Sequence, residues 1–210
     1  TLAGYLDPAD EIELQDEHVE ALTLDDEPDL VVIQVYITSA RRGYALALAA
    51  RSTADLEALA AELSAGGARA AIFPTDMRGP AQIQALATWA LTSFGRVDLL
   101  VNNAGVGGEG RAFRSADTDA IETLLAVNLR APMLLTRALL PQMIERRSGS
   151  IVFVGSVAGQ IAIPGSTIYS ATKFGLRGFA HALRREVARH RIGVTLIAPG
   201  FIDTAMTSSM

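Results

Sequence analysis

The 210-residue sequence contains no cysteine. A chain without thiols forms no disulfide, builds no thiolate metal site and has no cysteine nucleophile. Its three histidines, His18, His181 and His190, are scattered and lack the spacing of metal ligands. The composition therefore excludes thiol chemistry and gives no support to a metal enzyme.

Long apolar runs are also missing. No uninterrupted run reaches the roughly 20 residues that cross a bilayer, and no secretory signal pattern opens the chain. We therefore expect no membrane partner and take the cytoplasm as the default location. With half of its residues hydrophobic and 18 glycines, the chain has the composition of one α/β domain with a sizeable core.

Positive charge is absent from the first 30 residues. Residues 1–30 hold eleven of the 23 acidic residues and none of the 18 lysines and arginines. The excess of basic residues in the remainder is mild and dispersed, so we do not expect nucleic acid as a partner. The asymmetry predicts that the two parts of the chain differ in origin or role.

Lysine is almost absent as well, because Lys173 is the only one and every other basic side chain is arginine. Lys173 follows Tyr169 by four residues, so on a helix the two side chains share one face. An ammonium beside a phenol favours the phenolate, which suits Tyr169 to proton transfer near neutral pH. The alternative is an ordinary pair on a helix surface.

Ser156 is the third candidate catalytic residue. It follows the apolar run 151–154, which we interpret as a buried parallel strand. Its hydroxyl is therefore expected at the carboxyl end of a strand, the edge where open α/β sheets bind ligands.

Four motifs together resemble the short-chain dehydrogenase/reductase family. They are Ser156, the spacing of Tyr169 and Lys173, the run Asn102-Asn103-Ala104-Gly105, and the pair Pro199-Gly200. The resemblance extends from about residue 41 to the end. It implies a Rossmann-like three-layer α/β sandwich with a mostly parallel sheet, and NADP(H)-dependent reduction of a small carbonyl compound or oxidation of an alcohol. Residues 198–202 are similar to those of 3-oxoacyl reductases.

The resemblance also implies roles for single residues. Ser156 would bind the substrate oxygen, Tyr169 would donate the proton, and Lys173 would also bond the nicotinamide ribose. Asn128 would complete a proton relay, although a purely structural role is the alternative. Asn128 falls in a helical region expected at 117–146, which Pro132 and Pro141 should kink or break. This region and the helix expected at 169–190 would form the interface of a homo-oligomer.

Arg51 is the residue that indicates the cofactor. It ends the second expected strand, where a base accommodates the 2′-phosphate of NADP and an acid would favour NAD. A solvated loop charge is the alternative. The resemblance implies further cofactor contacts, besides Tyr169 and Lys173, from Ser52, Asp76, Met77, Asn103, Ala104, Gly105, Pro199, Gly200, Ile202 and Thr204. A turn aspartate is the alternative for Asp76.

The sequence departs from the family at its N-terminal side. The family's first strand runs into a glycine-rich turn that approaches the pyrophosphate. Here the strand expected at 30–37 is followed by residues 38–43, which contain one glycine and are too few for a crossover helix. We therefore predict a fold that lacks the usual first glycine-rich βα unit. The C-terminal end of the family fold is expected to be missing too.

Residues 12–42 resemble part of the cobalamin-binding domain that precedes some radical-SAM enzymes. This second resemblance predicts a chimera, with an atypical acidic segment at 1–40 and a truncated dehydrogenase domain at 41–210. The alternative is a divergent N-terminus whose strand at 30–37 still occupies the same position in the sheet.

Three other functions stay open. The chain is a catalytically impaired relic of the family if the missing loop abolishes NADP binding. It is a scaffold if it serves only to assemble through its two long helices. A ligand-binding module of the cobalamin type is the third possibility, and it depends on the N-terminal resemblance alone.

Overall fold

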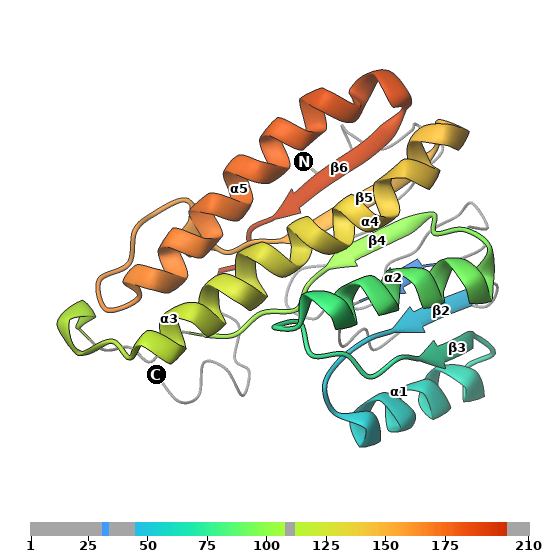
Figure 1. Ribbon diagram of the computed structural model, residues 1–210, viewed down its shortest axis with the longest axis horizontal. Coiled ribbons are helices and arrows are strands. Elements are labelled where there is room, and N and C mark those ends of the chain that lie inside the picture. Colours follow the sequence, from blue (N-terminus) through green and yellow to red (C-terminus); the bar gives the residue numbers. More distant parts are fainter. Residues whose placement is uncertain (1–30, 34–44, 108–111, 201–210) are drawn as a thin grey trace.

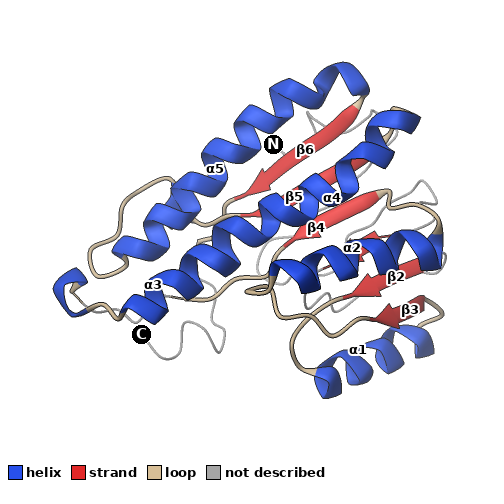
Figure 2. Cartoon of the chain, in the orientation of Figure 1, coloured by secondary structure: helices blue, strands red, loops and turns tan. Residues whose placement is uncertain are grey.

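The computed structural model describes residues 31–33, 45–107 and 112–200, which form a parallel sheet covered by helices (Figures 1 and 2). Six strands lie in the order β3-β2-β1-β4-β5-β6, and each pairing between neighbours is parallel. The strands are β1 (Val31–Ile33), β2 (Ala45–Leu48), β3 (Arg69–Ile72), β4 (Leu99–Asn102), β5 (Gly149–Val154) and β6 (Ile192–Ile197). The predicted α/β class is confirmed.

The helices divide between the two faces of the sheet. They are α1 (Thr53–Ala65), α2 (Pro80–Phe94), α3 (Thr118–Leu125), α4 (Ala131–Arg146) and α5 (Thr167–Val187). Buried residues of α2, α4 and α5 share one hydrophobic cluster with one face, and α1 packs in a second cluster on the other. Alternate residues of β2 serve the two clusters, since Ala45 and Ala47 belong to the first and Leu46 and Leu48 to the second.

Strand β1 occupies the centre of the sheet. Val31 pairs with Leu46 of β2 on one side and with Leu99 of β4 on the other. The position of a first strand is therefore filled, as the alternative of a divergent N-terminus predicts. The remainder of the strand expected at 30–37 and the connection to β2 lie outside the described residues. The chimeric origin of the N-terminal segment stays a prediction.

The long helical region at 118–146 is continuous, and it contains a π-helical segment that we did not predict. A π-helical segment, η3 (Ala126–Arg130), joins α3 to α4, whereas Pro141 lies inside α4 and Pro132 lies in its first turn. Neither proline breaks the helical region. Because Pro132 lies inside this continuous region, its missing N–H leaves a carbonyl of the preceding turn without its helical partner.

This region is long and apolar enough, by length and composition alone, to cross a membrane. Half of the most apolar 18-residue stretch of this region is nevertheless buried inside the protein. Leu135, Leu139 and Met143 of α4 have no exposed surface and lie in the core cluster. Its apolar character is therefore explained by packing against the sheet.

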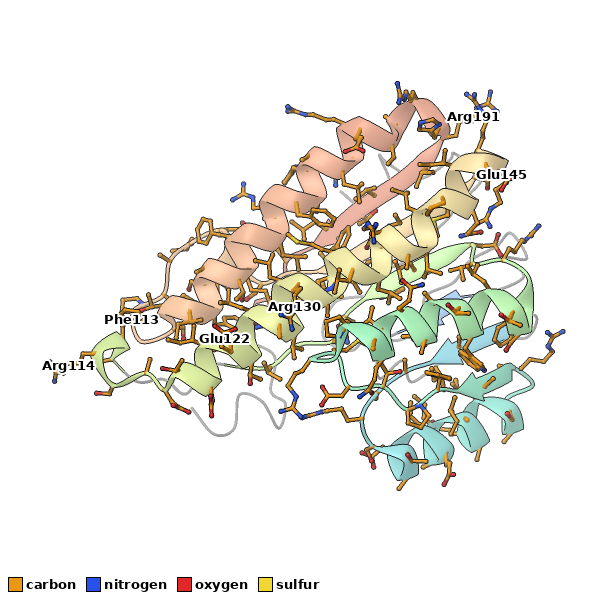
Figure 3. The ribbon with its side chains drawn as sticks, viewed as in Figure 1. Phe113, Arg114, Glu122, Arg130, Glu145 and Arg191 are labelled. Carbon is orange, nitrogen blue, oxygen red and sulfur yellow. The ribbon has the colours of Figure 1, made fainter. Side chains whose placement is uncertain are left out.

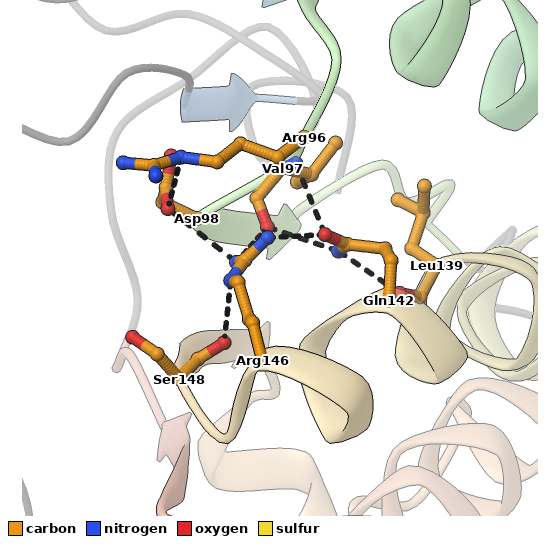
Figure 4. A network of polar contacts seen from close by, with 7 residues as sticks. All are labelled: Arg96, Val97, Asp98, Leu139, Gln142, Arg146 and Ser148. Carbon is orange, nitrogen blue, oxygen red and sulfur yellow. Dashed lines mark hydrogen bonds and ion pairs between the residues drawn. The ribbon is translucent and has the colours of Figure 1, made fainter.

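A polar network fastens the end of α4 to the start of β4 (Figure 4). The Gln142 amide donates to the carbonyl of Val97 at 3.0 Å. Arg146 donates to the carbonyl of Ser148 at 2.9 Å and forms an ion pair with Asp98 at 3.4 Å. These contacts lie at the amino edge of the sheet, away from the strand ends where the candidate catalytic residues were expected.

Candidate active site

Ser156 lies at the carboxyl edge of the sheet, as predicted. It follows β5 by two residues and caps the short 3-10 helix η4 (Val157–Gly159), where its Oγ accepts a hydrogen bond from the Ala158 N–H at 3.1 Å. The next residue, Val157, donates its backbone N–H to the Pro199 carbonyl at 2.9 Å. The serine loop and the turn after β6 are therefore joined.

Lys173 lies buried beneath this loop. Its side chain projects from α5 and donates from Nζ to the carbonyl of Val154, the last residue of β5, at 3.0 Å. The same Nζ lies 5.6 Å from the centroid of the Tyr169 ring, so the two side chains share one face of α5 as their spacing predicts. Burial lowers the pKa of the Lys173 ammonium from its ordinary value near 10.5 to about 8.

Gly159 sets how closely η4 approaches α5. A Cβ atom at this position would lie 2.8 Å from the backbone oxygen of Lys173 and 2.9 Å from its backbone carbon. Such contacts are closer than real Cβ atoms make, so the approach requires glycine. Three residues after Ser156, the serine loop thus packs directly on the helical turn that carries the lysine.

Asn128 connects three parts of the site. Its Oδ1 accepts from the Val106 N–H at 2.8 Å, and its Nδ2 donates to the Val106 carbonyl at 2.9 Å. The same Nδ2 lies 3.4 Å from Oγ1 of Thr172. The amide is therefore satisfied by the loop after β4 and by α5, which is the structural role foreseen as the alternative.

The loop after β4 also approaches the lysine. A Cβ atom on Gly105 would meet Asn128 Oδ1 at 3.5 Å and Lys173 Nζ at 3.8 Å. Asn103 and Ala104, which precede it, are half-buried. The motif 102–105 is thus brought to the polar atoms of the candidate site.

Asn102, the first residue of that motif, is buried at the end of β4. Its Nδ2 donates to Oγ1 of Thr136 at 3.2 Å, which ties the strand to α4. Its Oδ1 is buried without a hydrogen-bond partner. An unpaired buried acceptor costs free energy.

The residues expected to bind the adenosine half of a cofactor lie after β2 and β3. Arg51 is exposed, and Ser52 caps α1 by accepting from the Asp55 N–H at 3.3 Å. Met77 is buried. Ile202 and Thr204 lie outside the described residues, whereas Pro199 and the exposed Gly200 follow β6 as expected.

Asp76 adopts the turn conformation that was its alternative role. Its carboxylate accepts from the backbone N–H of Arg78 at 2.9 Å and forms an ion pair with the Arg78 guanidinium at 2.6 Å. These hydrogen bonds, with a smaller contribution from the charge of Arg51, hold the pKa of Asp76 below its ordinary value. The carboxylate is therefore engaged by arginine.

Sequence reasoning missed two basic residues near this turn. Arg78 lies beside Asp76, and Arg130 of η3 donates to the Arg78 carbonyl at 3.0 Å. The signal for Arg78 was its distance from Asp76, because an aspartate side chain commonly accepts from the backbone N–H two residues further on. No local signal places Arg130 there, since 52 residues separate it from Arg78.

A cavity of about 330 Å³ opens beside Tyr169. It lies between the start of α5, the loop after β4 and the α3 region, and the exposed Phe113, which is labelled in Figure 3, is among its lining residues. Its lining is largely apolar, and the residues that form it are Val106, Gly107, Phe113, Ala116, Asp117, Asp119, Ala120, Thr123, Leu124, Gly165, Ser166, Thr167, Ile168 and Tyr169. The sequence did not reveal this cavity.

Metal chemistry receives no support from the described part of the chain. No group of three or more histidine, aspartate or glutamate side chains there could hold a metal ion. The chemistry of the site is therefore that of a phenol, a hydroxyl, a buried amine and backbone amides.

The chain matches known proteins over most of its length. Residues 34–210 match the family model described as short chain dehydrogenase. Nodulation protein G of Rhizobium meliloti (strain 1021) is 44% identical over 155 residues, which cover 74% of this chain and 62% of that protein. The 3-oxoacyl-[acyl-carrier-protein] reductase of Homo sapiens is 40% identical over 171 residues, which cover 81% of this chain and 70% of that protein.

A solved structure agrees with these matches. A metagenomic short-chain oxidoreductase in complex with NADP superposes with a TM-score of 0.76 at 33% identity, covering 83% of each chain. The present chain spans less than two thirds of the length of the Rhizobium protein.

The close approach of Gly159 to α5 predicts a measurable change of stability. We expect Gly159→Ala to lower the free energy of unfolding by about 1–3 kcal/mol, because η4 must move away from Lys173. Gly178→Ala on the same helix is the matched control. An added Cβ there meets nothing within 4 Å, so alanine should stabilise the helix by about 0.5–1 kcal/mol. Urea unfolding measures both, and equal stability of the two variants would contradict the prediction.

The lowered pKa of Lys173 predicts a pH dependence. The unfolded chain keeps this proton up to about pH 10.5, whereas the folded chain releases it near pH 8. The free energy of unfolding should therefore rise between these pH values, by up to about 3 kcal/mol from this group. Lys173→Met should remove that rise. Urea unfolding across this range compares the two proteins, and parallel profiles would rule out a depressed lysine pKa.

Proposed function

Because the chain belongs to the short-chain dehydrogenase family, we propose that it transfers hydride between NADP(H) and a small carbonyl compound or alcohol. The observation that carries this proposal is the buried Lys173 ammonium at the carboxyl edge of the sheet, beside Tyr169, which lines a cavity. Few structural roles require a lone amine at such depth, because burial disfavours its charged form.

Tyr169 serves as the proton donor when a carbonyl is reduced. Tyr169 is one of the residues that line the cavity, so a substrate held there would lie beside it. The Lys173 ammonium favours the phenolate that remains after the proton has left. With a pKa near 8, this amine is itself able to take up or release a proton close to neutral pH.

Ser156 and Asn128 complete the proposed machinery. The Ser156 hydroxyl orients the substrate oxygen by a hydrogen bond, and its position is fixed by the contacts of η4 with α5. Asn128 acts as a positioning residue, because its amide holds the loop after β4 against the turn that carries Lys173. Its participation in a proton relay is part of the proposal.

The residues present fit a phosphorylated dinucleotide. The arginines Arg51 and Arg78 flank the turn after β3 and supply guanidinium groups suited to a 2′-phosphate. Gly105 lies beside Lys173 Nζ, so the loop after β4 reaches the candidate site. When bound, the cofactor supplies or accepts the hydride, while the protein provides orientation and electrostatics.

The cavity supports the proposal that the substrate is an apolar carbonyl compound. Its volume of about 330 Å³ and largely apolar lining suit an alkyl or acyl group beside the reacting carbonyl. A relative whose printed name is 3-oxoacyl-[acyl-carrier-protein] reductase makes a 3-oxoacyl compound the first substrate to test. We also propose assembly as a homo-oligomer through the two long helices, and a cytoplasmic location.

A catalytically impaired relic is the second candidate. It is favoured by the absence of the glycine-rich turn from the sequence between residues 38 and 43. NADPH fluorescence separates the two candidates, since the enzyme should show saturable binding and the relic none at millimolar cofactor.

Removal of the phenol hydroxyl tests the proton donor. We expect Tyr169→Phe to reduce the rate of carbonyl reduction by about 10²–10⁴-fold, because general acid catalysis is lost. The dissociation constant of NADPH, measured by fluorescence, should stay nearly unchanged and serves as the internal control. A variant with full reductase activity would refute the assignment.

Substitution of Arg51 tests the choice of cofactor. We expect Arg51→Ala to weaken NADPH binding about tenfold while leaving NADH binding unchanged, because one charge-assisted contact to the 2′-phosphate is lost. The matched control is Arg69→Ala, since Arg69 is exposed at the opposite edge of the same sheet. Equal effects of both variants would show that only overall charge matters.

A further inference from the structure

The cavity beside Tyr169 has charge of one sign among its described lining residues. Asp117 and Asp119 line it from the α3 side, and no lysine or arginine of the described ranges is part of the lining. Both aspartates are exposed, and neither carboxylate forms a hydrogen bond or an ion pair with another described residue. Two carboxylates are therefore available to interact with whatever enters the cavity.

Stabilisation of α3 is the simpler explanation for these two aspartates. An aspartate directly before a helix ordinarily accepts a hydrogen bond from a backbone N–H of the first turn. Asp117 precedes α3 without making that bond. Asp119 lies in the first turn, where a carboxylate interacts favourably with the helix dipole. The role in the helix therefore accounts for Asp119 in part, whereas the Asp117 carboxylate is not engaged by its own helix.

The α5 side of the cavity has the opposite polarity. Ser166, Thr167 and Tyr169 line the cavity at the start of this 21-residue helix. The first N–H groups of a helix have no partner within it, and Ser166 makes no side-chain capping bond to them. A helix N-terminus carries about half a positive charge. This side therefore suits the partly negative oxygen of a carbonyl group, next to the proposed proton donor.

The carboxylates outweigh the helix ends in the balance of charge. Both α3 and α5 begin at the cavity, and their two N-termini together supply about one positive charge. The two aspartates supply two negative charges, so the described lining is negative. A ligand in a cavity is partly removed from water, and like charges there repel more strongly than on the open surface. A negative charge on the substrate should therefore weaken its binding.

We propose that Asp117 and Asp119 are specificity-determining residues, which exclude anionic carbonyl compounds from the cavity and favour those that carry a positively charged amine. The carbonyl oxygen lies on the α5 side beside Tyr169, and the end of the substrate remote from the carbonyl lies on the α3 side. The inference rests on the proposed function, because it assigns the cavity to the substrate. A 3-oxoacyl group held as a neutral ester or thioester meets the requirement, whereas the free 3-oxo acid does not.

Three methyl ketones of the same shape test the selection by charge. They share a three-carbon linker and end in an isopropyl group, a dimethylammonium group or a carboxylate. Their dissociation constants follow from shifts of the amide resonances of Ala120 and Ile168, which line the cavity from α3 and from α5. At low salt we expect the cationic ketone to bind about tenfold more tightly than the anionic one, with the neutral ketone between them. This difference should shrink as the salt concentration rises.

The double variant Asp117→Asn/Asp119→Asn removes both charges with little change of shape. Asparagine is as suitable as aspartate before a helix, so α3 should remain folded, and the three ketones should bind with nearly equal affinity. The matched control is Glu122→Gln, because Glu122 is exposed on the same helix (Figure 3) but does not line the cavity. The control should keep the tenfold difference. Equal binding of the ketones by the unsubstituted protein, no shift with any of them, or a preference that survives in the double variant would overturn the proposal.

Reduction of the same three ketones by NADPH separates this inference from the proposed function. If none is reduced although binding follows charge and depends on the two aspartates, the proposed reaction fails and the selection of ligands by the cavity stands. If the ketones are reduced with equal kcat/KM, or in an order that Asp117→Asn/Asp119→Asn leaves unchanged, the aspartates do not select the substrate and the inference is overturned.

Discussion

The candidate site depends on one buried contact, the hydrogen bond from the Lys173 ammonium to the carbonyl of Val154. An ammonium at this depth is costly, and one carbonyl compensates only part of its lost hydration. The contact fixes α5 against the end of β5, and this places Tyr169 and Ser156 relative to each other. Gly159 and Asn128 act on the same turn of α5 from two other directions. The geometry of the site is thus organised around the lysine.

Much of the fold follows from local sequence signals. Ser52 and Pro80 mark helix starts, and apolar runs mark the strands, because these signals depend on backbone chemistry close in sequence. The shared face of Tyr169 and Lys173 follows from helix geometry in the same way. The catalytic roles of these residues remain proposals, supported by their placement.

Other features could not be predicted because they depend on contacts distant in sequence. The cavity beside Tyr169 combines the loop after β4, the α3 region and the start of α5, and no single segment indicates it. The π-helical segment of the long helix was not predicted, and its Asn128 bonds a loop 22 residues away in the sequence. The strand β1 was recognised from its apolar run, but its slot in the sheet depends on partners in β2 and β4.

The central place of that short strand has a consequence for how the chain behaves in the cell. Among the residues that the structure describes, the pair β3-β2 and the group β4-β5-β6 are joined within the sheet by the three residues of β1. If β1 were cleaved off or pulled away, β2 and β4 would each present a row of unpaired amides and carbonyls. Bare strand edges of this kind recruit strands from neighbouring molecules. Loss of the residues before 34 would thus expose two strand edges to pairing with other chains.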